Sequence, residues 1–411
     1  MSRVTRILLP AAAALWAAHG QAAWAAPAAP APAPACPASP STGGSTTISL
    51  ACSRPGVMPS ISTKVRVRWA ASLKPAARAA STAAARAPSL ATAATMTKVA
   101  MPSMRRFGYA DSLSTGAIAA GGTLGILIPP SVVMIIFGLL TEADIGKLFL
   151  AGIIPGIVGI LGYLAAVMVA VRLNPSLAPE VGEPHPLTRR DLISVVAVLA
   201  LFAFIMVGIY GGFFTPSEAA GMGAAASLVI AALTGGLSRA TLWTALVDSA
   251  TASAMIFAII IGAEIFGNFV TFAGLPDTLS DLVEHLGLSP WMVMLVIVVI
   301  YMILGCFLES LSMILLTVPV FYPVISGLDF GLEILVDPDA VLIWFGIIVV
   351  VVTEISLITP PIGMNVFVLR SVLPDVPLKT IFRGVYVFWA SDIIRLALIV
   401  AVPWLSLALL R

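Results

Sequence analysis

The sequence predicts an all-α membrane protein, a polytopic helical chain with inverted repeats, two re-entrant hairpins and broken helices. Of its 411 residues, 59% are hydrophobic and only 10% are charged, whereas soluble domains carry about 25% charged residues. Several apolar stretches reach the roughly 20 residues that a membrane-spanning helix needs. A Pro-Pro pair also occurs twice within apolar sequence, as "GILIPPS" (125–131) and "SLITPPI" (356–362).

The first 88 residues differ in composition from the rest. Residues 1–110 contain twelve Lys and Arg and no Asp or Glu, and residues 1–88 are rich in Ala, Pro, Arg and Ser. Such tracts bury too little apolar surface to become ordered. We therefore interpret residues 1–88 as a low-complexity segment, either disordered or not native coding sequence. Residues 1–26 resemble a secretory signal, with Arg3 and Arg6 before an apolar run and a small-residue "AWA" site.

Apolar segments follow one another after Ser89. Segments long enough to span a membrane lie at residues 147–171, 192–212, 218–236, 251–273, 289–307, 340–358 and 384–410. Shorter apolar segments, which predict half-helices or hairpin arms, lie at residues 112–125, 130–141, 309–325 and 361–373. Basic residues favour cytoplasmic loops. This rule places Arg105, Arg172 and Arg239 inside and predicts an acidic outside loop at 277–285.

An internal repeat relates the two Pro-Pro pairs. When residues 129–130 are aligned with 360–361, "TMTKVAMP" (95–102) falls opposite "SMILLTVP" (312–319), with fourteen extra residues in the second copy. Downstream, "DIGKLFLAG" (144–152) resembles "DVPLKTIFRG" (375–384). Paired units of this kind are typical of inverted repeats, in which broken helices meet near the bilayer midplane and hold ions and substrate. The membrane domain at 89–411 then divides into repeat one (89–173), a linker (174–191), scaffold helices (192–288) and repeat two (289–411).

Each Pro-Pro break leaves backbone groups that lipid cannot satisfy. Such a break is tolerated where a cation binds the freed carbonyls or an anion binds a helix N-terminus. Small and hydroxyl residues would give a ligand access to the backbone at both breaks: Gly121, Gly122, Thr123 and Gly125 in the first, and Thr353, Ser356, Thr359 and Asn365 in the second. A single break would favour a proline kink without a ligand, but two matching breaks favour ligand sites.

Carboxylates within apolar runs are functional candidates, because ionisable groups are costly in the membrane. The chain has four of them: Glu264, Glu309, Glu354 and Asp392. Glu309 and Glu354 flank the second hairpin and break, so they are candidates for tuning sodium or proton coupling. Asp392 and Arg395 stand at i and i+3 on one helix and are expected to pair with each other.

Four motifs in a fixed order resemble a known family. They are "SLATAATMTKVAMPSMRRFGY" (89–109), "TGAIAAGGTLGILIPPS" (115–131), "FFTPSEAAGMGA" (213–224) and "TEISLITPPIGMNVFVL" (353–369). Together they resemble the large membrane subunit, DctM type, of tripartite ATP-independent periplasmic (TRAP) transporters, from about Ser89 to Arg411. The sequence departs from the family at its front, where low-complexity sequence replaces several membrane helices and the usual "GSS" of the first hairpin reads "APS" (87–89).

The resemblance implies a multi-pass permease of the bacterial inner membrane. Its mobile transport domain would hold two hairpins inside a scaffold. Sodium ions, the only cofactors implied, would drive import of an organic acid such as a C4-dicarboxylate. A periplasmic binding protein would deliver this acid, and a small four-helix membrane subunit would complete the complex.

The resemblance also implies ligand residues, mainly backbone carbonyls and hydroxyls, which suit a hard cation. The first sodium site would use Ser89, Gly125, Ile128 and Pro130. The second would use Gly305, Cys306, Ser356, Thr359 and Pro361. The substrate would lie between the hairpin tips, near Thr92, Ser310 and Asn365.

Two other functions stay open at this stage. The altered front favours a non-transporting truncated remnant or an assembly partner of such a complex. A membrane enzyme would need a nucleophile with a base or a metal cluster, and neither motif stands out, so no catalytic residue is predicted. The sequence has no GxxxxGK[ST] phosphate loop, which disfavours ATP-driven transport.

Overall fold

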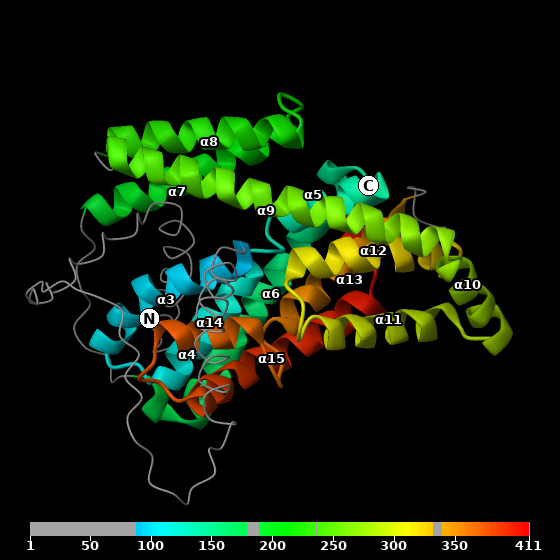
Figure 1. Cartoon of the computed structure of the whole chain (residues 1–411). Coiled ribbons are helices and arrows are strands. Elements are labelled where there is room, and N and C mark those ends of the chain that lie inside the picture. The colour runs from blue at the N-terminus through cyan, green and yellow to red at the C-terminus, as the bar shows by residue number, and fades with distance from the viewer. Residues whose placement is uncertain (1–87, 179–188, 235–236, 332–338, 411) are drawn as a thin grey trace, which may run out of the picture. The chain divides into compact units, whose positions relative to one another are not determined.

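The computed structural model describes residues 88–178, 189–234, 237–331 and 339–410. Within these residues the secondary structure is helical and contains no strand, so the predicted all-α class is confirmed (Figure 1). The predictions for the low-complexity segment 1–88 fall almost wholly outside the described residues. Its last residue, Pro88, already begins the first described helix.

Most of the helices overlap a predicted apolar segment, whereas α3 and α10 correspond to none. The first group is α3 (Pro88–Arg106), α4 (Asp111–Leu124), α5 (Val132–Thr141), α6 (Ile145–Leu173), α7 (Arg189–Tyr210), α8 (Pro216–Leu233) and α9 (Arg239–Phe272). The second group is α10 (Leu275–Leu286), α11 (Pro290–Leu304), α12 (Ser310–Ser326), α13 (Ala340–Ser356), α14 (Met364–Val372), α15 (Leu378–Ala401) and α16 (Trp404–Leu407). Short 3-10 turns follow α6 at Pro175–Leu177 and α16 at Ala408–Leu410.

Two of the predicted elements are wrong. The acidic stretch 277–285 is not a loop but lies inside helix α10, which is bounded by Gly274 and Gly287 in the left-handed conformation. The segment 384–410 is not one helix. Helix α15 ends at Ala401 and α16 begins at Trp404, because Pro403 cannot donate the backbone hydrogen bond that a continuing helix needs.

Length and composition suit a membrane. Among the described residues, α6, α8, α9 and α15 are long and apolar enough to cross a bilayer, and five shorter apolar helices accompany them. Helix α9 exposes large apolar side chains along its length, including Phe257, Ile265 and Phe272. Lipid can cover such a surface, whereas monomeric soluble proteins rarely expose apolar patches of this size.

The two broken helices run in opposite directions. In the first, α4 leads into the break at 125–131 and α5 leaves it; in the second, α13 and α14 flank the break at 357–363. Arg105 forms ion pairs with Asp111 at the start of α4 and with Asp375 just beyond α14, so those two ends lie together. Phe137 of α5 packs edge-on against Phe345 near the start of α13. The chain therefore contains two antiparallel units, as the internal repeat predicts.

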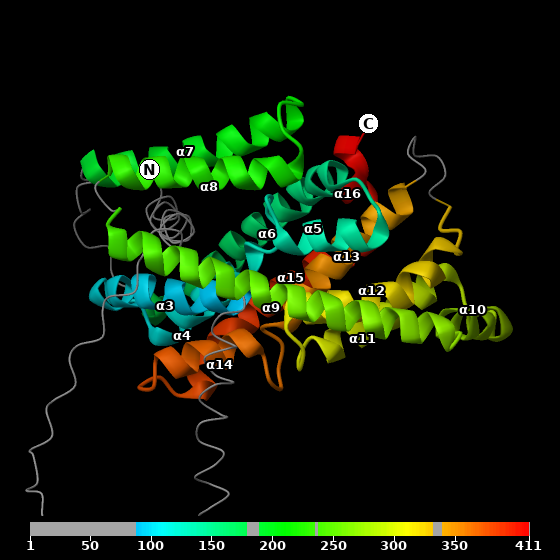
Figure 2. The same ribbon diagram turned by 45° about the horizontal axis from the view of Figure 1, so that its top comes forward.

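The two units also exchange packing partners. Helix α3 packs on α4 of its own repeat and on α14 of the other, while α12 packs on α13 of its own repeat and on α5 of the other. Figures 1 and 2 both show the blue α3 beside the orange α14. At the end of α12, the Tyr322 hydroxyl donates to the Thr141 carbonyl of α5 over 3.1 Å. Helices α3 and α12 thus each pack on the half-helix that leaves the other repeat's break.

Candidate ion and substrate site

The second break brings the predicted hairpin residues against the end of α13. A Cβ built on Gly305 would lie only 1.9 Å from the Ser356 Oγ, so the two backbones approach as closely as they do because Gly305 has no side chain. The Cys306 Sγ lies 3.9 Å from the carbonyl oxygens of Thr359 and Pro360. The structure therefore gathers Gly305, Cys306, Ser356 and Thr359 in one place, as the resemblance implies.

The Thr359 hydroxyl has three hydrogen-bond partners at this break, one of which is the Met302 Sδ at 3.5 Å. The hydroxyl donates to the Ile355 carbonyl over 2.7 Å and accepts from the Trp389 Nε1 over 3.0 Å. The Thr359 side chain is buried, whereas Pro360 and Pro361 are exposed. The second break thus has a buried polar side chain at Thr359 and an exposed tip at Pro360 and Pro361. A ligand approaching the protein surface would meet the exposed tip first.

The first break is less completely described. Gly125 and Ile128 are half-buried and Pro130 is exposed, and the Ser89 and Thr92 side chains lie outside the described part of α3. A Cβ on Gly122 would lie 3.5 Å from the Ala93 Cα. Helix α3 therefore packs against α4 just before the break at ordinary van der Waals distance, whereas Gly305 lies much closer to Ser356 in the second copy.

Ser131 is a residue of the first break that sequence reasoning missed. Its hydroxyl donates to the Ile126 carbonyl, and its oxygen accepts from the Met134 backbone N–H at the start of α5. These two hydrogen bonds connect the start of the break to the start of α5. The available signal was a serine directly before an apolar helix, which is a preferred N-cap.

Asn365 and Ser310, two of the predicted substrate residues, differ in their surroundings. Asn365 is fully buried at the second position of α14. Its side-chain oxygen and nitrogen both lack a hydrogen-bond partner among the described residues. Because an unpaired buried amide is costly, its position marks a place where a bound ligand would be stabilising. The Ser310 hydroxyl instead donates to the Glu309 carboxylate over 2.9 Å at the start of α12.

The intramembrane carboxylates separate into different environments. The predicted Asp392–Arg395 pair is confirmed, with 3.0 Å between the Oδ1 and Nη2 atoms. The sequence did not reveal that Arg395 also binds Glu354 over 2.8 Å. All three side chains are buried, whereas Glu264 is exposed on α9.

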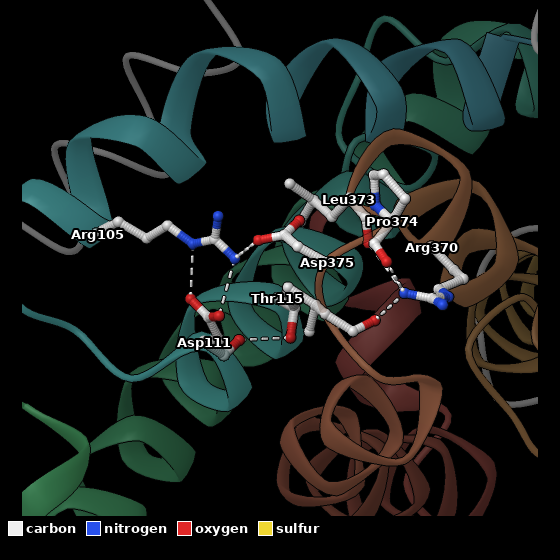
Figure 3. A network of polar contacts seen from close by, with 8 residues as sticks. Arg105, Asp111, Thr115, Arg370, Leu373, Pro374 and Asp375 are labelled. Carbon is white, nitrogen blue, oxygen red and sulfur yellow. Dashed lines mark hydrogen bonds and ion pairs between the residues drawn. The ribbon is translucent and has the colours of Figure 1, made fainter.

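A group of charged contacts lies at the C-terminal end of α3. The Arg105 guanidinium lies 2.8 Å from Asp111 and 2.6 Å from Asp375 (Figure 3). The hydrogen bond from Arg105 lowers the pKa of Asp375 below its ordinary value. Arg370 donates to the carbonyls of Pro374 and Val376, over 2.6 Å each, which fixes the segment between α14 and α15.

The same end contains the segment that follows α6. The Ala110 backbone N–H donates to the Leu177 carbonyl over 3.1 Å. The sequence predicts that Arg105, Arg172 and Arg239 lie on the cytoplasmic side. The segments that follow Arg105 and Arg172 meet at this end, as a shared side requires.

Fold and site together define the class of the protein: a polytopic membrane permease with two broken helices in inverted halves. The family model described as "Tripartite ATP-independent periplasmic transporter, DctM component" matches residues 87–405. The chain belongs to this family. It is a large permease subunit of a TRAP transporter, located in the inner membrane, and is a transport protein rather than an enzyme.

Several relatives are similar in sequence over most of this chain. The C4-dicarboxylate TRAP transporter large permease protein of Pseudomonas aeruginosa is 35% identical over 78% of this chain and 72% of the relative. The isethionate TRAP transporter permease protein of Oleidesulfovibrio alaskensis is 33% identical over 69% of this chain and 43% of its own length. The sialic acid TRAP transporter large permease protein of Vibrio cholerae is 30% identical over 78% of this chain and 72% of the relative.

Proposed function

We propose that this permease subunit imports a small organic acid by symport with sodium ions. A periplasmic binding protein delivers the acid, and a small four-helix membrane subunit completes the complex. The second break is the observation on which the proposal rests. There Gly305 lies against Ser356, and the Cys306 Sγ lies 3.9 Å from the carbonyl oxygens of Thr359 and Pro360, next to an exposed tip. Carbonyl and hydroxyl oxygens at such a break suit a hard cation.

The charge of the substrate favours cation symport. The relatives are named for C4-dicarboxylates, isethionate and sialic acid, which are all anions at neutral pH. Moving one negative charge into a cell whose interior is negative costs about 2.3 kcal/mol per 100 mV. Two or more sodium ions carried with a dicarboxylate would remove this cost and would add the energy of the sodium gradient.

Reconstitution tests the proposal. The chain, its small subunit and its binding protein are placed in proteoliposomes, and uptake of labelled succinate, isethionate and sialic acid is followed with and without an inward sodium gradient. We expect one of these acids to accumulate only with the gradient, and equally well without ATP. Full uptake in sodium-free buffer would contradict sodium coupling. No uptake of any acid by an assembled complex would favour a non-transporting remnant or assembly partner.

A further inference from the structure

A continuous chain of buried polar contacts joins four helices between the two breaks. The Thr123 hydroxyl has two acceptors for its single hydrogen, the Ala120 carbonyl at 2.8 Å and the Glu354 Oε1 at 3.3 Å, and the Glu354 Oε2 lies 2.8 Å from the Arg395 Nη2. The same Nη2 lies 3.0 Å from the Asp392 Oδ1, and the Tyr163 hydroxyl donates to the Asp392 Oδ2 over 2.6 Å. Every side chain in this polar chain is at most 2% exposed. Together the contacts link α4 and α6 of repeat one to α13 and α15 of repeat two.

The link between Thr123 and Glu354 joins equivalent positions of the repeat. These residues are 231 positions apart, the same separation as between Pro129 and Pro360. Thr123 stands two residues before Gly125, and Glu354 stands two residues before Ser356. The hydrogen bond therefore connects the last turn of one broken helix to the last turn of the other, where both enter their breaks.

Movement at this link would reach the backbone of both breaks. The Thr123 carbonyl accepts the N–H of Ile126 over 2.9 Å, inside the first break. On the other side, the N–H of Ile358 donates to the Ile355 carbonyl over 3.1 Å, and the Ser356 hydroxyl donates to the Thr353 carbonyl over 2.7 Å. The last turns of α4 and α13 thus pass directly into the carbonyl-bearing segments.

Stability alone is a weak reason for this polar chain. Buried ion pairs gain little over well-packed apolar residues of similar volume, because desolvation offsets their attraction. The backbone of α6 nevertheless leaves room for the Arg395 guanidinium, since a Cβ on Gly159 would lie 2.2 Å from the Nη1. A buried polar network with several partners can instead select one relative arrangement of the helices that it joins.

We propose that Glu354 is a positioning residue that couples the two breaks. By binding Thr123 and Arg395 together, it holds the ends of α4 and α13 in one relative position. Ion binding that orders one break then favours the binding geometry of the other. Glu354 itself touches no ion in this proposal. The inference rests on the proposed function, in which each break binds a sodium ion.

Sodium titrations of the purified complete complex test this coupling. Binding is followed by the sodium-dependent rise in the melting temperature, and transport by uptake into proteoliposomes. We expect the unmodified complex to show a Hill coefficient that approaches the number of coupled sites, about two. Glu354→Gln and Thr123→Val should each lower it toward about one while sodium still binds. Thr123→Ser retains the hydroxyl and should restore the original value.

A matched control separates positioning from general stability. Thr317→Val removes another buried hydrogen bond, which joins the Thr317 and Tyr301 hydroxyls over 2.7 Å between α12 and α11 and does not involve Glu354. It should lower the melting temperature without changing the Hill coefficient.

Thr123→Val is the milder variant should Glu354→Gln fail to fold. An unchanged Hill coefficient in Thr123→Val, or a value of one in the unmodified complex, overturns the coupling but leaves sodium-driven uptake intact. Uptake that does not depend on the sodium concentration would instead overturn the proposed function.

Discussion

Thr359 is the residue whose side chain tests the second ion site most directly. A hydroxyl has one hydrogen to donate and two lone pairs. The Thr359 hydroxyl shares its hydrogen between the Ile355 carbonyl and the Met302 Sδ and uses one lone pair for Trp389, so among the described residues nothing donates to the second lone pair, which we expect to bind a cation. Thr359→Val keeps the shape of the side chain but removes this oxygen. Losing one neutral ligand costs on the order of 1 kcal/mol by analogy with a lost hydrogen bond. We expect a five- to tenfold rise (about 1 to 1.4 kcal/mol) in the sodium concentration that half-saturates uptake.

Trp389→Phe is the matched control for Thr359→Val. It removes the indole donor but leaves the Thr359 hydroxyl in place. We expect this variant to keep the sodium affinity of the unmodified complex. If it weakens sodium binding as much as Thr359→Val does, the hydroxyl acts by holding Trp389 and not as an ion ligand.

Local rules explain which site residues could be predicted from the sequence. The Asp392–Arg395 pair was predictable because the residues are three apart on one helix. The Glu354–Arg395 pair joins two helices across 41 residues, and no local spacing rule reaches that far. The internal repeat offered the one long-range signal, since aligning the Pro-Pro pairs places Thr123 opposite Glu354. Asn365 is buried without a side-chain hydrogen-bond partner among the described residues. This depends on tertiary packing and could not be predicted from the sequence.

The stability that the Asp375–Arg105 contact provides depends on pH. The pKa of Asp375 is lowered by the hydrogen bond from Arg105, so the folded state gains stability from the ionised form. This gain is fully present above the unfolded pKa of about 4 and is lost as the pH falls through the lower, folded-state value. We expect the melting temperatures of the unmodified protein and Asp375→Asn to differ by a small, constant amount between about pH 5 and 8, and to converge in acid. A difference that grows below about pH 4 would contradict the assigned sign.

Helices α4 and α15 cross at a pair of glycines. A Cβ on Gly384 would lie 1.8 Å from the Ser112 carbonyl oxygen, and a Cβ on Gly116 would lie 2.5 Å from the Gly384 backbone. Both obstacles are backbone atoms, which cannot rotate away as a side chain can. We therefore expect Gly384→Ala to force the helices apart and to destabilise the protein by about 1–3 kcal/mol, measured as a lower unfolding midpoint in detergent.

Gly221 on α8 provides the control for this crossing. A Cβ there would meet nothing within 4 Å. Because alanine favours helix over glycine by about 1 kcal/mol, Gly221→Ala should leave the midpoint unchanged or raise it. A loss in Gly221→Ala equal to that in Gly384→Ala would contradict this explanation, because it would show that the loss does not come from the close crossing.

Element boundaries were predictable where composition changes sharply. The predicted segment 340–358 became α13 at Ala340–Ser356, and 112–125 became α4 at Asp111–Leu124. The stretch 277–285 was misread because its polar residues suggested a loop, although they occupy one face of an amphipathic helix. Helix α9 begins at Arg239, well before the predicted 251, since charged and polar residues in its first turns hid a continuous helix from an apolar criterion.

At the scale of the whole molecule, the two halves share their hydrophobic interior. One buried cluster combines α5 of repeat one with α11, α12 and α13 of repeat two. The other combines α3, α4 and α6 of repeat one with α14 and α15 of repeat two. Because each cluster contains helices of both repeats, neither repeat forms a complete hydrophobic core by itself. The hairpin arms and broken helices are therefore expected to move as one body during transport.

A disulfide inside this body tests whether α3 and α4 move together. The Cβ of Ala93 lies 3.6 Å from a Cβ built on Gly122, within the range of about 3.5–4.5 Å that a disulfide requires. We expect Ala93→Cys with Gly122→Cys, in a background with Cys36→Ser and Cys52→Ser, to form a bond on oxidation and to retain sodium-driven uptake. Gly122→Cys alone is the control for the substitution itself. If oxidation stops uptake in the double variant and a reductant restores it, α3 slides against α4 in each cycle, and the arm and the broken helix are separate moving parts.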